Sequence, residues 1–146
     1  MNIIRAIDEY YAARARKLMK TRKIFYWICT VLIAFFFLSG GVVDLLRPPQ
    51  ALEGMTQLGY PAYFMIILGA WKVLGGAVIL LPGLRLVKEW AYAGIIFDLT
   101  GASASHIAVH DNLQHILTPL ILAALVAASW ALRPDSRRLD SAASRA

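Results

Sequence analysis

The sequence predicts an all-α membrane protein: an up-down bundle of four transmembrane helices preceded by an amphipathic helix at the membrane interface. Hydrophobic residues make up 59% of the 146 residues and charged residues only 16%, whereas a soluble domain is typically about 45–50% apolar and about 25% charged. Four apolar runs each have roughly the 20 residues that cross a hydrocarbon core of about 30 Å. Short polar turns separate the last three runs, which makes neighbouring helices antiparallel.

The N-terminal segment, residues 1–23, is predicted to be a basic amphipathic helix on the cytoplasmic side. Its apolar residues recur at helical spacing: Ile4, Ile7, Tyr11, Ala15 and Leu18. Charged residues occupy the other face. Such a helix beside a membrane span is typical of one lying on an anionic leaflet, and a frayed, solvated tail is the alternative.

The membrane domain is predicted over residues 24–132. Its spans are expected at about 24–43, 62–81, 87–109 and 113–132. The first span contains no charge and has Tyr26 and Trp27 at its cytoplasmic end, where interfacial aromatic residues are enriched.

The remaining segments are predicted to be connections and a tail. Pro48 and Pro49 forbid a continuous helix after the first span, and residues 50–58 fit a short surface helix. Pro119 predicts a kink in the fourth span. Residues 133–146 form a polar cytoplasmic tail that is expected to be disordered.

The distribution of Lys and Arg predicts the orientation. Thirteen of these residues lie in the N-terminal segment, the turn between spans 2 and 3, and the tail, whereas the other side has only Arg47. Because cytoplasmic loops carry the excess of positive charge, both termini are expected in the cytoplasm, with the protein in the inner membrane. The retained first span shows no signal-peptide cleavage site.

Several classes of function are excluded by what the sequence lacks. The net charge of +6 follows membrane topology, so it does not indicate nucleic-acid binding. The single cysteine, Cys29, excludes an internal disulfide and CxxC chemistry. No Ser/His/Asp arrangement, phosphate-binding loop or paired carboxylates support a hydrolase or a kinase.

Two ionisable residues lie deep in the second and third spans, Lys72 and Asp98. Counted from the turn at residues 83–84, both lie roughly 17–22 Å from the cytoplasmic side. Glycines flank each charge and would let the two helices approach closely, so a Lys72–Asp98 pair is expected. The pair is either a structural ion pair or a proton-relay or ligand site; snorkelling of Lys72 into lipid is a third interpretation.

A second group of polar residues lies toward the outer face. Its members are Ser105, His106, His110, Asp111 and His115. Several of them are spaced four apart, which allows a proton-exchanging, quinone-facing, haem or metal cluster. Plain interfacial histidines are the other interpretation. The spacing is permissive, so these residues are candidates for facing a ligand or quinone, and no metal site and no catalytic residue is assigned.

Several strings in this region resemble the DoxX-like family of small four-span membrane proteins. They are FFFLSGGVVDLL, LGYP, WKVLG, EWAYAG, DLTGA and the SH that ends the third span. The similarity covers roughly residues 30–132 and implies a four-helix membrane bundle. The positions that match the family are Gly59, Tyr60, Pro61, Lys72, Gly75, Trp90, Ala91, Asp98, Gly101, Ser105 and His106.

The resemblance also implies a range of functions. Related proteins are associated with quinone-linked thiosulfate oxidation and with membrane oxidoreductase complexes that handle thiol or oxidative stress, and others act as chaperone-like membrane proteins. The expected function is a non-catalytic accessory subunit that binds a protein partner in a membrane redox complex. The alternative is a quinone- or thiol-linked oxidoreductase component that uses a Lys72/Asp98 pocket, with quinone as its cofactor.

Overall fold

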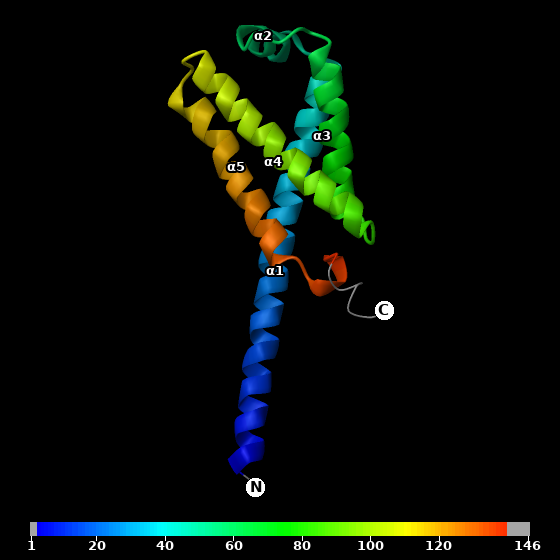
Figure 1. Ribbon diagram of the computed structural model, residues 1–146, viewed down its shortest axis with the longest axis vertical. Helices are drawn as coiled ribbons and strands as arrows, with labels where there is room; N and C mark the ends of the chain where they lie inside the picture. Colours follow the sequence, from blue (N-terminus) through cyan, green and yellow to red (C-terminus); the bar gives the residue numbers. More distant parts are fainter. Residues whose placement is uncertain (1–2, 140–146) are drawn as a thin grey trace.

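The computed structural model describes residues 3–139 and confirms the all-α class, since it contains five α-helices, a 3-10 helix and no strand over this range (Figure 1). The helices are α1 (Ile3–Leu46), α2 (Pro49–Gln57), α3 (Phe64–Leu80), α4 (Arg85–Ala108), α5 (Leu113–Leu132) and the 3-10 helix η1 (Asp135–Arg137).

The N-terminal segment and the predicted first span are continuous in the structure, with no break in the helix between residues 23 and 24. One helix of 44 residues, α1, contains both this segment and the predicted first span. The sequence explains the continuity, because residues 3–38 contain no Gly and no Pro that would interrupt a helix. Side chains 7–25 are all exposed, and Tyr26 is the first buried one. The N-terminal half of α1 therefore stands clear of the other helices (Figure 1).

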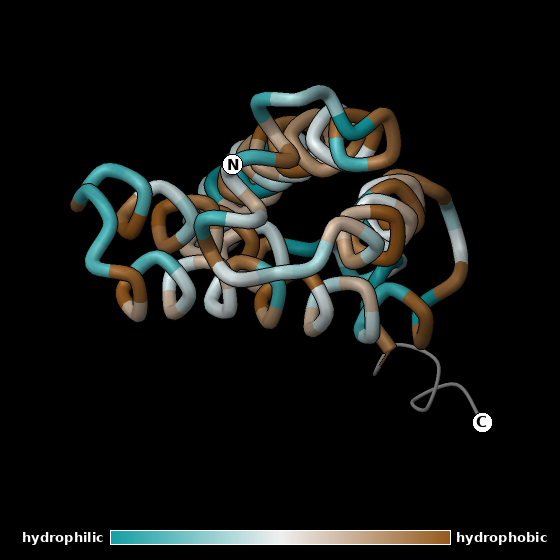
Figure 2. The backbone as a smooth tube through the Cα atoms, turned by 90° about the horizontal axis from the view of Figure 1, so that it is seen from above, coloured by the Kyte–Doolittle hydropathy of each residue, from teal (hydrophilic) through white to brown (hydrophobic). Residues whose placement is uncertain are grey.

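The four long helices α1, α3, α4 and α5 alternate in direction along the chain (Figure 1). Helix α1 packs most extensively against α3, and α4 against α5; the ring is completed by contacts of α1 with α5 and of α3 with α4. Viewed along the bundle, hydrophobic residues follow the helices, whereas hydrophilic ones are concentrated in the connections (Figure 2). Two of the described helices are long and apolar enough to cross a membrane, Ile7–Leu46 and Leu113–Leu132.

A buried chain of hydroxyl groups joins α1, α4 and α5 inside the bundle. Thr30 of α1 donates to the carbonyl of Tyr26 at 2.7 Å, so its Oγ1 accepts from Ser129 of α5 at 2.8 Å. Ser129 in turn accepts from the Tyr92 hydroxyl of α4, also at 2.8 Å. Each hydroxyl has one proton, so the first donation fixes the direction of the whole chain. The polar groups are satisfied within an otherwise apolar core.

The tail packs against the bundle as far as the structure describes it, so the expectation of disorder is wrong for residues 133–139. Arg133 pairs with Glu89 at 2.7 Å and is 4% exposed at its side chain. Arg137 donates to the carbonyls of Ile79 and Leu80, at 3.2 and 3.3 Å, where α3 ends. Its guanidinium also lies over the Trp27 ring, 4.6 Å from the centroid. The arginines dock because each finds an acceptor or an aromatic face. Residues 140–146 lie outside the described part.

Candidate functional site

The partner of Lys72 is Asp44, and the expected Lys72–Asp98 ion pair is not formed. The Lys72 ammonium nitrogen lies 2.8 Å from Asp44 Oδ2, and the two side chains are 23% and 12% exposed. Asp98 lies close enough for the charge of Lys72 to act on it. Among residues 3–139, however, Asp98 makes no hydrogen bond or ion pair. The cation of α3 is thus bound to α1 rather than to α4.

A close crossing of two glycines explains this choice of partner. A Cβ atom added to Gly69 of α3 would meet the carbonyl oxygen of Gly41 at 2.8 Å, and one added to Gly41 would meet the carbonyl oxygen of Gly69 at 2.9 Å. Only glycine permits this approach. Asp44 and Lys72 each follow their glycine by three residues, about one helical turn, so they meet beside the crossing.

The glycines of α4 do not have the packing role expected of them. Added Cβ atoms at Gly94 and Gly101 would meet nothing within 4 Å, and one at Gly76 of α3 would meet Leu38 of α1 at 3.1 Å. Gly69 and Gly76 of α3 therefore face α1, and the side of α4 that carries Asp98 is left with free space beside it.

That space is a cavity of about 450 Å³ formed by α1, α3, α4, α5 and α2. Its walls are mainly aromatic and aliphatic side chains, and α2 contributes Met55 at the end nearest the α4–α5 turn. Six of its lining side chains carry polar groups: Tyr60, Lys72, Asp98, Ser105, His106 and Thr118. Sites for small molecules have typical volumes of about 300–1,000 Å³ and combine apolar walls with a few polar groups. One cavity thus brings Lys72 and Asp98 together with two members of the outer group, Ser105 and His106.

Tyr60 is fixed in the wall of this cavity by two contacts. Its ring stacks on Phe64 with a centroid distance of 4.9 Å and an interplanar angle of 11°. Its hydroxyl lies 2.7 Å from Ser105 Oγ. Because Ser105 donates its one proton to the carbonyl of Gly101 at 2.9 Å, Tyr60 is the donor to Ser105.

A second cavity of about 520 Å³ lies on the other side of Lys72 and Asp98, toward the α3–α4 turn. It is lined by Trp71, Trp90 and Gly94 among other mainly apolar residues. Lys72 and Asp98 line both cavities and so stand between them.

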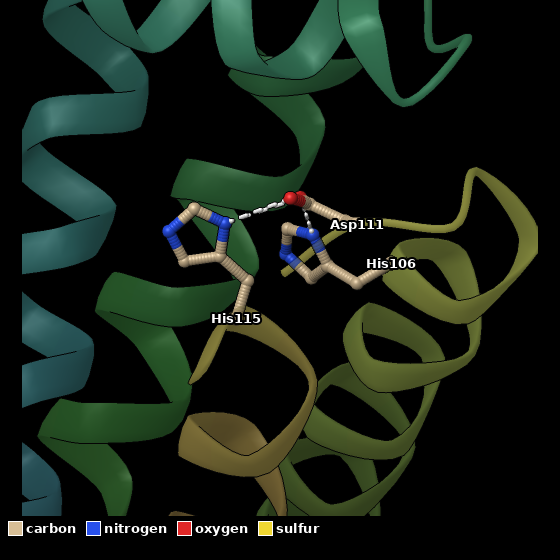
Figure 3. A group of neighbouring side chains, drawn as sticks. All are labelled: His106, Asp111 and His115. Carbon is tan, nitrogen blue, oxygen red and sulfur yellow. Dashed lines mark hydrogen bonds and ion pairs between the residues drawn. The ribbon is translucent and has the colours of Figure 1, made fainter. Parts of the chain in front are cut away.

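At the α4–α5 turn, two of the outer candidates, His106 and His115, contact the carboxylate of a third, Asp111 (Figure 3). Asp111 Oδ2 lies 2.7 Å from His106 Nδ1, and His115 Nδ1 lies 3.1 Å from both oxygens. The Asn112 backbone N–H, 2.6 Å from Oδ1, and the two imidazoles lower the pKa of the Asp111 carboxyl to about 2. The carboxylate is therefore ionised at neutral pH.

His110 does not join this cluster. It occupies the turn itself with a φ of 56°, a left-handed conformation that is uncommon outside glycine, and its side chain is exposed. The i, i+4 spacing of His106 and His110 does not place them on one helix face, because α4 ends at Ala108.

The sequence reasoning missed three contributors to the site. Asp44 was placed beyond the end of the first span; the glycine pair Gly40 and Gly41 just before it is the signal for a close helix contact. Met55 lies in the predicted short surface helix, and the sequence of so short a helix does not indicate that this side chain lines a cavity. Tyr60 matched the family, but its bond to Ser105 joins residues 45 positions apart.

The comparison with known proteins agrees with these helices. A model of the DoxX-like family matches residues 28–129, more than two thirds of the chain. No curated protein and no solved structure matches. The family and the apolar helices together suggest a small membrane protein, for which contact with lipid is plausible. The matched segment contains α3, α4, the Lys72–Asp44 pair and the whole outer cluster, and the chain belongs to the DoxX-like family.

Proposed function

We propose that the chain is a four-span inner-membrane protein, with both termini in the cytoplasm, that binds a quinone-class ligand in the cavity beside Asp98. The single observation that carries the ligand assignment is this cavity of about 450 Å³, with apolar walls and a few polar groups.

The charge distribution over the bundle supports the four-span orientation. The basic start of α1, the α3–α4 turn and the tail lie toward one end of the molecule, and α2 and the α4–α5 turn lie toward the other (Figure 1). The first of these ends carries nearly all the Lys and Arg residues. The 17 residues of α3 have a length of about 26 Å, which is at the short limit for a span.

The lining of the cavity matches the chemistry of a quinone. A quinone ring is flat and apolar and carries two carbonyl oxygens that accept hydrogen bonds. Aromatic side chains such as Phe36 and Phe97 offer faces for the ring. Asp98 and His106 can supply a proton when the ring is reduced and remove one when it is oxidised.

Filling the cavity tests this assignment with a matched control. Gly101→Leu places a large side chain in the cavity, at a position where the Cβ itself meets nothing. It should weaken binding of a short-chain ubiquinone analogue to the full-length protein in nanodiscs by roughly tenfold or more, since a filled site excludes the ring. Titration of tryptophan fluorescence would measure the affinity.

Gly94→Leu is the control, because Gly94 lies on the same helix, has the same free space and lines only the second cavity. Both variants gain the same helix propensity. Equal affinities for the wild type and Gly101→Leu would overturn the assignment, and a loss confined to Gly94→Leu would move the ligand to the second cavity.

A second candidate function, an accessory subunit that binds a protein partner in a redox complex, is favoured by the free half of α1. Ile7, Tyr11 and Leu18 form an apolar stripe that is 49%, 63% and 63% exposed. A partner packed along the stripe would remove these apolar side chains from water, which is favourable. The full-length protein purified in mild detergent should then retain a stoichiometric partner.

Substitutions on the two faces of α1 test the accessory function. Tyr11→Glu should release the partner because it puts a charge on the stripe, whereas Ala13→Glu adds the same charge on the opposite face and should not. Retention of the partner by Tyr11→Glu, or a wild-type protein without one, would count against this function.

A further inference from the structure

We propose that His106, Asp111 and His115 form a binding site for a divalent first-row transition metal ion. The site would join the end of α4 to the beginning of α5. It shares His106 with the cavity assigned to the quinone, but an ion can bind there whether or not the cavity takes a ligand.

The donor set is the first argument. Two imidazoles and one carboxylate are common ligands of Zn²⁺ and of non-haem Fe²⁺, and three protein ligands leave at least one position open for water or a substrate. The three side chains offer one ligand atom each, and these atoms lie within 4.8 Å of one another. Asp111 lies between the two histidines (Figure 3).

The distances already approach those of an occupied site. Metal–nitrogen and metal–oxygen bonds of about 2.0–2.2 Å in a tetrahedron put neighbouring ligand atoms about 3.3 Å apart. The two imidazole nitrogens lie 2.7 and 3.1 Å from the carboxylate. The ligand atoms of the set lie within 4.8 Å of one another, so the two imidazoles would have to move toward each other to complete the tetrahedron. Each imidazole would then bind through one ring nitrogen and keep its proton on the other.

The carboxylate is held in place by groups that are not ligands themselves. The Asn112 N–H donates to Asp111 Oδ1 at 2.6 Å, and the Asp111 N–H donates to the carbonyl of His106 at 2.9 Å. The Asn112 side chain also caps α5 by accepting from the Gln114 N–H at 3.1 Å. Outer-shell hydrogen bonds of this kind orient metal ligands and raise affinity.

The site has access both to solvent and to the cavity. The His115 side chain is 58% exposed, which provides a route for the ion, whereas His106 is 21% exposed and lines the cavity beside Ser105. An open coordination position on the cavity side would bring the metal within reach of an oxygen atom of a bound molecule.

The same three residues would also hold the turn together without a metal, through imidazole–carboxylate hydrogen bonds alone. Direct titration distinguishes the two cases. The full-length protein, stripped with chelator and dialysed, is titrated with Zn²⁺ by calorimetry and with Co²⁺ by absorption, since tetrahedral Co²⁺ gives intense visible bands.

A single Zn²⁺ per chain is expected for the wild type and for His110→Ala, which removes the turn histidine outside the cluster. Asp111→Asn and His115→Ala should bind roughly tenfold or more weakly and lose the Co²⁺ bands. His115 is largely exposed, so its variant should stay folded, and its melting temperature without metal provides the check.

Two outcomes would overturn the proposal. One is a wild-type protein that binds no Zn²⁺ above the level of the His115→Ala variant. The other is a His110→Ala variant that loses binding as completely as His115→Ala, which would indicate unspecific chelation by the histidines of the turn.

Discussion

At the scale of single residues, Lys72 and Asp98 do not form the ion pair that the sequence predicts. Lys72 is paired with Asp44 and so joins α3 to α1, whereas Asp98 lines both cavities and forms no hydrogen bond or ion pair within residues 3–139. An ion pair with little exposure contributes through its hydrogen bond and costs desolvation. An intramembrane carboxyl that has no hydrogen-bonded ion pair is more readily explained by a functional role than by a role in stabilising the fold.

Substitutions in the two acids should therefore have opposite consequences for stability. Asp44→Asn should lower the free energy of unfolding by about 1–3 kcal/mol, because it removes a charged partner from Lys72. Asp98→Asn should leave it unchanged or raise it, because no bond is lost. Thermal unfolding in detergent, followed by circular dichroism, measures both. A larger loss for Asp98→Asn would restore Asp98 as the partner of Lys72.

At the scale of the elements, the crossing of α1 and α3 fixes the geometry of the bundle. Gly41 and Gly69 allow two backbones to touch, and the position of the Lys72–Asp44 pair follows from that contact. Helices α3 and α4 have no such crossing at Gly94 or Gly101, and the cavities form beside them.

Adding one methyl group tests this difference between the glycines. Gly69→Ala should destabilise the protein by about 1–3 kcal/mol, since its Cβ would lie 2.8 Å from the Gly41 carbonyl oxygen. Gly94→Ala should be neutral or stabilise by up to about 1 kcal/mol through helix propensity. Chemical denaturation in mixed micelles compares the two variants; equal stabilities would show that the crossing is looser than described.

The end of α3 is held by cations from two other segments. Lys88, which is fully buried, donates to the carbonyls of Val78 at 2.8 Å and of Leu81. Arg137 of the tail donates to the two carbonyls between them, those of Ile79 and Leu80. These carbonyls have no partner within their own helix. Positive charge at a helix C-terminus also interacts favourably with the helix dipole.

Removing the buried cation should weaken this end of the bundle. Lys88→Met should lower the melting temperature, with a loss of about 1–3 kcal/mol, because it leaves two carbonyls unsatisfied. Lys20→Met, on the exposed part of α1, is the control and should have no measurable effect. Differential scanning fluorimetry is sufficient for the comparison, and equal melting temperatures would exclude a capping role for Lys88.

At the scale of the whole molecule, the sequence predicts elements better than it predicts their contacts. The extent of α5 agrees with the predicted fourth span at 113–132, and α4 agrees with the third within two residues at its start. These limits depend on local hydropathy and turn residues, which the sequence displays directly. The partner of Lys72, the covering position of Met55 and the docking of Arg137 depend on which helices become neighbours, and a single sequence contains no direct signal for that.

The orientation of the whole chain can be measured by cysteine labelling. In a Cys29→Ala background, Glu53→Cys lies on α2, and Asp135→Cys lies in the tail, where the Asp135 side chain is 88% exposed. A membrane-impermeant maleimide should label Glu53→Cys in intact spheroplasts and label Asp135→Cys only after lysis. The reverse pattern would invert the topology, and labelling of both would contradict an even number of spans.

The unbroken helix α1 gives the molecule the mechanics of a lever. Its 44 residues form a rod of about 66 Å, of which about 35 Å extends past the first buried residue, Tyr26. Because a helix is stiff over this length, a tilt of about 10° at the bundle would move the far tip by about 6 Å. A small change in the packing of α1 against α3, where the Lys72–Asp44 pair lies, would therefore produce a larger displacement at the N-terminal tip of α1.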